Sequence, residues 1–208
     1  MLSGHSEHTP AACPLPVKIV VSGGFGVGKT TLIGAISEIE PLTTEAAMTE
    51  VSVGVDDTAV LPDKSTTTVA FDFGRITLDS SYVLYMFGTP GQERFSFLWD
   101  DVSDGALGAI LLVDTRRIED CYPVIDYFEE REMPFVVAVN TFDGADRFET
   151  EEVREALGVS ADTKIVHCDA RNRASVKGVL VELIENVLLQ HDSRHSSDTE
   201  APERLVTG

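Results

Sequence analysis

The chain has 208 residues, of which 43% are hydrophobic, and a formal net charge of −19 at pH 7. This length can supply one domain with a full core, and no apolar run approaches the roughly 18 residues of a membrane span. The acidic balance argues against nucleic acids and anionic membrane surfaces as partners. The three cysteines are far apart, which favours a reducing cytoplasm and no metal site. We therefore expect a cytoplasmic protein with no direct membrane anchor.

The ends of the chain differ in composition from its middle. Residues 1–15 are polar and contain histidine and proline, so we expect a flexible N-terminal segment. Residues 191–208 are polar and low in aromatics, which predicts a disordered C-terminal tail. The intervening residues 16–190 are expected to form a single domain.

Strand and helix patterns alternate along this middle region. The expected strands are residues 17–21, 68–73, 82–87, 109–113, 135–139 and 164–166. The expected helices follow residue 30 and cover residues 94–102, 121–132, 150–157 and 174–190. This order predicts an α/β fold, with a doubly wound, mostly parallel sheet of six strands. A predicted hairpin makes residues 68–73 its one antiparallel edge strand, and residues 38–64 are expected to be a long loop.

A glycine-rich loop, GGFGVGKT, directly follows the first predicted strand at residues 23–30. It matches the pattern G-x-x-x-x-G-K-[ST] of the phosphate-binding P-loop, in the required context of strand before and helix after. Lys29 would reach the β- and γ-phosphates, and the Thr30 hydroxyl would ligate Mg²⁺. The expected phosphate-binding residues are Gly23, Gly24, Phe25, Gly26, Val27, Gly28, Lys29, Thr30 and Thr31. The sequence therefore predicts a P-loop NTPase.

Two segments after later strands have the chemistry to read a guanine base. Asp143 could accept hydrogen bonds from both N1–H and the 2-amino group, a pair of donors that adenine lacks. Asn140 would brace the loops around the base, and the backbone N–H of Ala170, between Asp169 and Arg171, would donate to guanine O6. The alternative for Asn140 and Asp143 is an ordinary polar turn after a strand.

Two further segments could respond to the γ-phosphate. Gly91 would donate its N–H to that phosphate, and Gln92 would orient the attacking water, unless Gln92 merely starts a helix. A threonine before the edge strand would close on Mg²⁺; Thr68 is the first choice, with Thr66 and Thr67 as alternatives. Four apolar residues at helical spacing follow Gln92 and form either a buried face or a partner surface: Phe95, Leu98, Trp99 and Val102.

With these motifs in this order, residues 17–190 resemble the Ras-like small GTPases. Thr89-Pro90-Gly91-Gln92 resembles switch II, Asn140-x-x-Asp143 the guanine motif, and Asp169-Ala170-Arg171 the Ser-Ala-Lys loop. Within that family the chain looks closest to bacterial MglA-type GTPases and to actinobacterial conservon GTPases. The resemblance implies GTP/GDP and Mg²⁺ as cofactors and slow, partner-stimulated GTP hydrolysis in signalling or polarity. It also implies a roadblock-fold activator or other switch-binding protein, and a sensor-kinase-like protein, as partners.

Four positions depart from the pattern of that family or leave a role open. Gly88 stands where switch II usually has Asp, so Mg²⁺ would lose one outer-shell anion. Thr141 replaces the lysine whose stem covers guanine, and Phe25 takes a usually small position beside the γ-phosphate. Asp114 resembles a metal-binding aspartate of other P-loop enzymes, although a structural role is preferred. Gly88, Thr141 and Phe25 favour an alternative, a pseudo-GTPase that acts as a nucleotide-binding interaction module.

Overall fold

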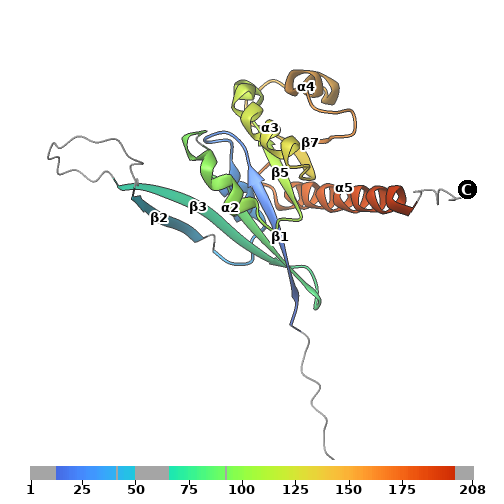
Figure 1. Cartoon of the computed structure of the whole chain (residues 1–208). Helices are drawn as coiled ribbons and strands as arrows, with labels where there is room; N and C mark the ends of the chain where they lie inside the picture. Colours follow the sequence, from blue (N-terminus) through green and yellow to red (C-terminus); the bar gives the residue numbers. More distant parts are fainter. Residues whose placement is uncertain (1–12, 41, 50–65, 92, 200–208) are drawn as a thin grey trace, which may run out of the picture.

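The computed structural model describes residues 13–40, 42–49, 66–91 and 93–199, with backbone alone for 42–49, 66–70, 93–94 and 192–199. Within these ranges seven strands form one sheet, in the order β2-β3-β4-β1-β5-β6-β7 (Figure 1). The strands are β1 (Leu15–Ser22), β2 (Leu42–Thr49), β3 (Thr66–Thr77), β4 (Tyr82–Gly88), β5 (Gly108–Val113), β6 (Phe135–Asn140) and β7 (Lys164–Cys168).

Helices cover both faces of this sheet. They are α1 (Lys29–Ile36), α2 (Trp99–Ser103), α3 (Tyr122–Glu130), α4 (Thr150–Leu157) and α5 (Arg173–Thr199), with 3₁₀ helices η1 (Glu93–Leu98) and η2 (Thr115–Cys121). Side chains of α1 and α5 pack in one core cluster, and side chains of α2, α3 and α4 pack in the cluster on the opposite face. The doubly wound α/β fold expected from the alternating pattern is confirmed.

The parallel strands place the candidate site at one edge of the sheet. β1 pairs in parallel with β4 and β5, and β6 pairs in parallel with β5 and β7. Every residue of β5 and β6 is buried, because helices lie on both faces of these central strands. The carboxyl ends of all five strands therefore meet at the edge where the sequence motifs follow them.

The sheet has one strand more than the six expected, and the additional strand lies in the segment predicted to be a loop. β2 pairs antiparallel with β3, and β3 pairs antiparallel with β4, so the expected hairpin is confirmed but is not the edge. Alanine and glutamate in β2 weaken its local strand signal. An edge strand of this kind is specified by the open backbone groups of its neighbour, which the local sequence does not reveal.

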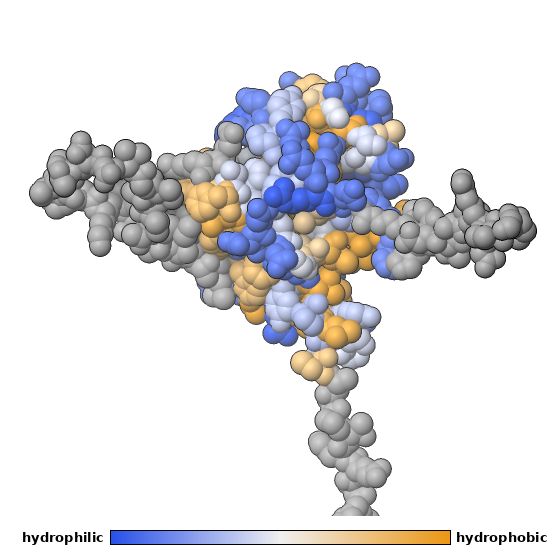
Figure 2. Space-filling view, viewed as in Figure 1, coloured by the Kyte–Doolittle hydropathy of each residue, from blue (hydrophilic) through white to orange (hydrophobic). Residues whose placement is uncertain are grey.

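The C-terminal helix continues beyond its predicted end. α5 reaches Thr199, so the first part of the expected disordered tail is helical, and residues 200–208 lie outside the described chain. Once a helix has formed, adding a residue to its end costs little free energy. α5 can therefore continue beyond the residues whose apolar side chains are buried. Leu188 and Leu189 are exposed near the place where α5 leaves the domain body, and Figure 2 shows hydrophobic side chains gathered there. No described helix has the length and apolar character to cross a membrane.

Candidate functional site

The glycine-rich loop adopts a backbone that its glycines make possible. Gly23, Gly26 and Gly28 have positive φ values of 140°, 74° and 105°. A Cβ at Gly23 would clash with the carbonyl oxygen of Leu112 in β5. The loop can therefore pack against the sheet only with glycine at this position. The segment ends at Gly28, where α1 begins with Lys29. The predicted strand–loop–helix cradle is thus present.

Lys29 lies buried beneath the loop. Its Nζ donates to the carbonyl oxygens of Gly23 at 2.9 Å and Gly24 at 2.8 Å, and the residue is 8% exposed. Burial lowers the pKa of this amine to about 8, and nearby Asp72 and Asp120 only partly oppose the effect. A buried cation held by neutral carbonyls would gain strongly from a phosphate oxygen beside it.

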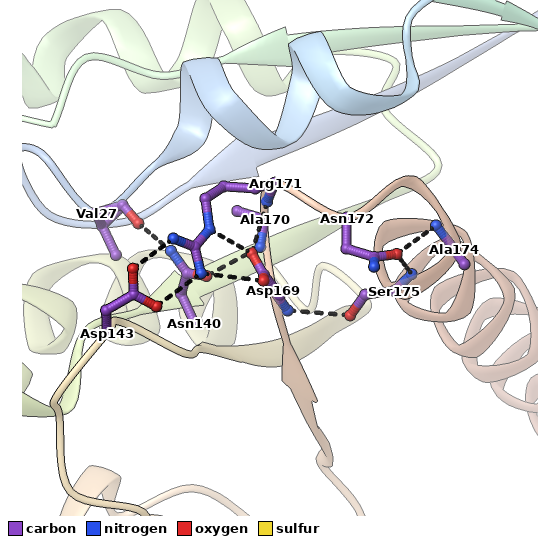
Figure 3. A network of polar contacts seen from close by, with 9 residues as sticks. All are labelled: Val27, Asn140, Asp143, Asp169, Ala170, Arg171, Asn172, Ala174 and Ser175. Atoms are coloured by element: carbon purple, nitrogen blue, oxygen red, sulfur yellow. Dashed lines mark hydrogen bonds and ion pairs between the residues drawn. The ribbon is translucent and has the colours of Figure 1, made fainter.

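Asn140, the last residue of β6, joins two loops that are distant in sequence. Its Nδ2 donates to the carbonyl oxygen of Val27 at 2.9 Å, and its Oδ1 accepts from the N–H of Ala170 at 3.0 Å (Figure 3). Both bonds are buried, and a Cβ at Gly28 would come within 2.9 Å of the same Nδ2. The bracing role predicted for Asn140 is therefore present in the geometry.

Three charged side chains meet beside this brace. The Arg171 guanidinium donates to Asp143 at 2.9 and 3.1 Å and to Asp169 at 2.9 and 3.1 Å (Figure 3). These hydrogen bonds hold the pKa of both carboxyl groups below the usual range. The structure brings Asp143, Ala170 and Arg171 together as predicted, and it adds an ion pair that the sequence did not indicate.

Asp114 has a structural partner. Its two carboxylate oxygens accept from the Arg116 side chain at 2.8 and 2.7 Å, and one of them also accepts from the Arg116 N–H. The Arg116 guanidinium in turn lies 4.0 Å from the ring centroid of Phe142. Asp114 thus positions Arg116 against Phe142, in the loop that holds Asn140 and Asp143, in agreement with the preferred structural role for Asp114.

The switch II segment begins against the P-loop. Thr89 donates its N–H to Val21 at 2.9 Å, and its hydroxyl lies 2.8 Å from that of Ser22. A Cβ at Gly91 would lie 2.6 Å from Lys29 Nζ, so Gly91 closely approaches the lysine predicted to bind phosphate. Gln92 lies outside the described residues, and its predicted role stays a prediction.

Thr68 lies in β3 and pairs with Ala47 of β2. β3 begins at Thr66, two residues before the predicted start at Thr68. Thr68 precedes Asp72 by four residues, which corresponds to about 13 Å along an extended strand. This pairing does not bring Thr68 to Thr30, and its proposed closure on Mg²⁺ would require a rearrangement.

An open cavity of about 510 Å³ connects the phosphate loop with β3 and switch II. It is lined by Phe25, Gly26, Gly28, Lys29, Thr30, Thr31, Asp72, Thr89, Pro90 and Gly91. All but Asp72, Thr89 and Pro90 are predicted site residues. Sequence patterns did not single out Asp72 as a site residue beyond its place in the predicted edge strand, because its position at the cavity depends on strand register. A larger hollow of about 770 Å³ lies between β7 and α5, away from these motifs.

The helical face after Gln92 is mostly core. Leu98, Trp99 and Val102 are buried, which supports the buried-face alternative for these three residues. Phe97, which the spacing did not select, is 58% exposed and remains available at the surface.

Comparisons with known proteins identify the family and the fold of the chain. A family model described as "Conserved hypothetical ATP binding protein" matches residues 21–199, from the end of β1 to the end of α5. The chain belongs to this family. An uncharacterized protein of Methanocaldococcus jannaschii is 29% identical over 139 residues, covering 66% of this chain and 77% of the relative. Ras-related protein RABC2a of Arabidopsis thaliana is 27% identical over 184 residues, covering 84% and 79%.

Among solved structures, the G domain of the T. maritima FeoB iron transporter superposes with a TM-score of 0.54 at 19% identity. That match covers 84% of this chain and 98% of the transporter domain. At this identity the likeness shows the fold alone. Relatives and structure together show a nucleotide-binding, GTPase-like domain with a Ras-like P-loop fold.

Proposed function

We propose that the protein is a guanine-nucleotide-binding regulatory GTPase that hydrolyses GTP slowly. The observation that carries the proposal is the Asn140 amide, which ties the phosphate loop at Val27 to the base loop at Ala170. Asp143 lies beside this brace with a carboxylate suited to the N1–H and 2-amino donors of guanine. This arrangement supports a guanine preference, although the family description names ATP.

In the proposed reaction, water attacks the γ-phosphorus, the bond to the β–γ bridging oxygen breaks, and GDP and phosphate leave. Lys29 would neutralise phosphate charge, Gly91 would donate its N–H to the γ-phosphate, and Gln92 would orient the water. The Thr30 hydroxyl offers Mg²⁺ the hard oxygen donor it prefers. When bound there, Mg²⁺ would supply positive charge that offsets the negative charge developing on the phosphate oxygens.

We further propose a regulatory role of the MglA or conservon type, in the cytoplasm of a bacterial cell. The Thr89–Gln92 motif and the closely placed Gly91 support a segment that senses the γ-phosphate. A roadblock-fold activator or another switch-binding protein would dock there, and a sensor-kinase-like protein would belong to the same signalling system. Exposed Phe97 lies beside the segment and offers an apolar contact for such a partner.

The direct test is the identity of the nucleotide released when the purified protein is denatured, together with GTP and ATP competition against a labelled guanine nucleotide. We expect guanine nucleotide in the protein and a clear preference for GTP. Equal affinity for ATP and GTP, or release of adenine nucleotide, would contradict the guanine assignment. The GTP-to-GDP ratio over time reports the hydrolysis rate.

The second candidate is an interaction module that binds nucleotide without turnover. Phe25, 62% exposed at the lip of the cavity, favours it because a phenyl ring there obstructs an entering catalytic group. Gln92→Leu separates the two proposals in single-turnover assays with the partner present. A GTPase should lose its stimulated rate in this variant and keep GTP binding. Equally slow, unstimulated hydrolysis in wild type and variant would favour the module.

A further inference from the structure

The absence of a side chain at Gly88 is matched by a carboxylate on the neighbouring strand. β3 and β4 pair antiparallel so that Asp72 lies directly opposite Gly88. A Cβ built at Gly88 would come 3.0 Å from Asp72 Cβ and 3.3 Å from Asp72 Oδ2. The Asp72 side chain therefore fills the space that a side chain at position 88 would take.

Asp72 also contacts the residue proposed to ligate Mg²⁺. The Thr30 hydroxyl donates to Asp72 Oδ2 at 2.6 Å, a distance typical of a hydrogen bond to a carboxylate. Because the hydroxyl gives its proton to Asp72, its oxygen lone pairs face elsewhere and can accept a cation. Asp72 lines the same cavity as Lys29 and Thr30.

We propose that Asp72 supplies the outer-shell carboxylate for Mg²⁺ that the family pattern places at position 88. The anion has moved across the β3–β4 pair to the neighbouring strand, where it orients the Thr30 hydroxyl and holds metal-bound water. Mg²⁺ in nucleotide sites keeps several waters and prefers carboxylate and hydroxyl oxygens, which these residues present. The inference rests on the proposed nucleotide function and replaces the expectation that Gly88 leaves the metal without this anion.

The test uses release of N-methylanthraniloyl-GDP from the full-length protein, measured by fluorescence across a range of Mg²⁺ concentrations and in EDTA. Asp72→Asn should raise the Mg²⁺ concentration that half-maximally slows release by about 10-fold or more, as loss of outer-shell partners typically does. Release in EDTA should match wild type, because the phosphate loop and base loops are unchanged. Asp126→Asn, an exposed carboxylate on α3, is the charge-matched control and should leave the Mg²⁺ titration unchanged.

A swap of the two residues makes the test sharper. Gly88→Asp alone should impair folding, because its side chain meets Asp72 and adds a like charge. Combined with Asp72→Gly, it moves the carboxylate back to β4, and this double variant should recover wild-type Mg²⁺ dependence. Thermal unfolding of each variant identifies any loss of fold.

The outcomes separate the inference from the function on which it rests. If wild type binds no guanine nucleotide, the proposed function itself fails. If wild type binds nucleotide and Asp72→Asn keeps the same Mg²⁺ titration, the Asp72 assignment is wrong and the GTPase proposal stands. A folded Asp72→Asn protein that loses affinity equally in EDTA, with no recovery in the swap, would also overturn the assignment.

Discussion

Arg171 donates to both carboxylate oxygens of Asp143, so the residue proposed to read the base is held by a cation from the neighbouring loop. A carboxylate has about four acceptor positions, so Asp143 can keep part of this pair while accepting from guanine. The same guanidinium also donates to Asp169, so one cation holds carboxylates of both loops. The position of the Asp169–Arg171 loop should thus affect base recognition, because Arg171 in this loop holds Asp143.

The base preference should follow the carboxylate at position 143. Asp143→Asn replaces an acceptor with a donor, which suits the 2-oxo group of xanthine. We expect weaker GTP binding and stronger XTP binding in competition assays, with an unfolding midpoint near wild type because the ion pair is exposed. Asp146→Asn, in the same exposed loop, is the control. Unchanged GTP and XTP affinities in Asp143→Asn would show that the motif has been misinterpreted.

Lys29 should stabilise the nucleotide complex and destabilise the free protein. Its pKa in the folded state is about 8, below its ordinary 10.5, so the unfolded state binds more protons between these values. The free protein should therefore gain stability as pH rises from about 8 to 10.5. Lys29→Met removes this titration, and near neutral pH it should be more stable by up to about 3 kcal/mol.

Urea unfolding of both proteins at pH 7 and pH 9.5 measures this difference, which should shrink at the higher pH. The same variant should lose most nucleotide affinity by calorimetry, because one charge serves two phosphates. A Lys29→Met protein less stable than wild type at pH 7 would contradict the cost assigned to burying this amine.

Asn140 should matter for both stability and binding. Asn140→Ala leaves the Val27 carbonyl and Ala170 N–H without their partner, at a cost of about 1–3 kcal/mol for each buried group. Asn140→Asp keeps the acceptor for Ala170 but turns a buried carboxylate oxygen toward the Val27 carbonyl oxygen, so it should cost at least as much. Asn186→Ala is the matched control: Asn186 is also buried and donates to Phe135 at the opposite end of β6. It should lower the unfolding free energy and leave nucleotide affinity unchanged.

The ring of Phe25 should limit access to the γ-phosphate position without supporting the fold. Phe25 is 62% exposed, and Arg117 donates a hydrogen bond to its backbone carbonyl at 3.2 Å, which does not depend on the ring. Phe25→Gly should therefore keep thermal stability near wild type and preserve or raise partner-stimulated hydrolysis in single-turnover assays. A large fall in the stimulated rate, with GTP binding intact, would mean that the ring itself positions the reaction.

Local sequence patterns predicted the parts of the site that depend on short segments. The P-loop, the buried runs of β5 and β6 and the Asn140 brace each follow from a motif joined to a strand end. β2 and Asp72 could not be predicted in this way, because a strand's pairing and register depend on residues far away. Asp72 faces Thr30 only because β3 is registered against β4 with Gly88 opposite. The Arg171–Asp143 pair likewise depends on two loops meeting, which no spacing reveals.

The Asn140 amide also has a consequence for how the protein is made. It joins Val27 near the start of the chain to Ala170 near its end, so the nucleotide cradle has no complete form in a shorter fragment. During synthesis, β1 and its glycine loop leave the ribosome long before β7 does. We expect a nascent chain to acquire nucleotide affinity only after the Asp169–Arg171 loop has emerged. Guanine nucleotide would then bind as one of the last events of folding and favour completed chains over truncated ones.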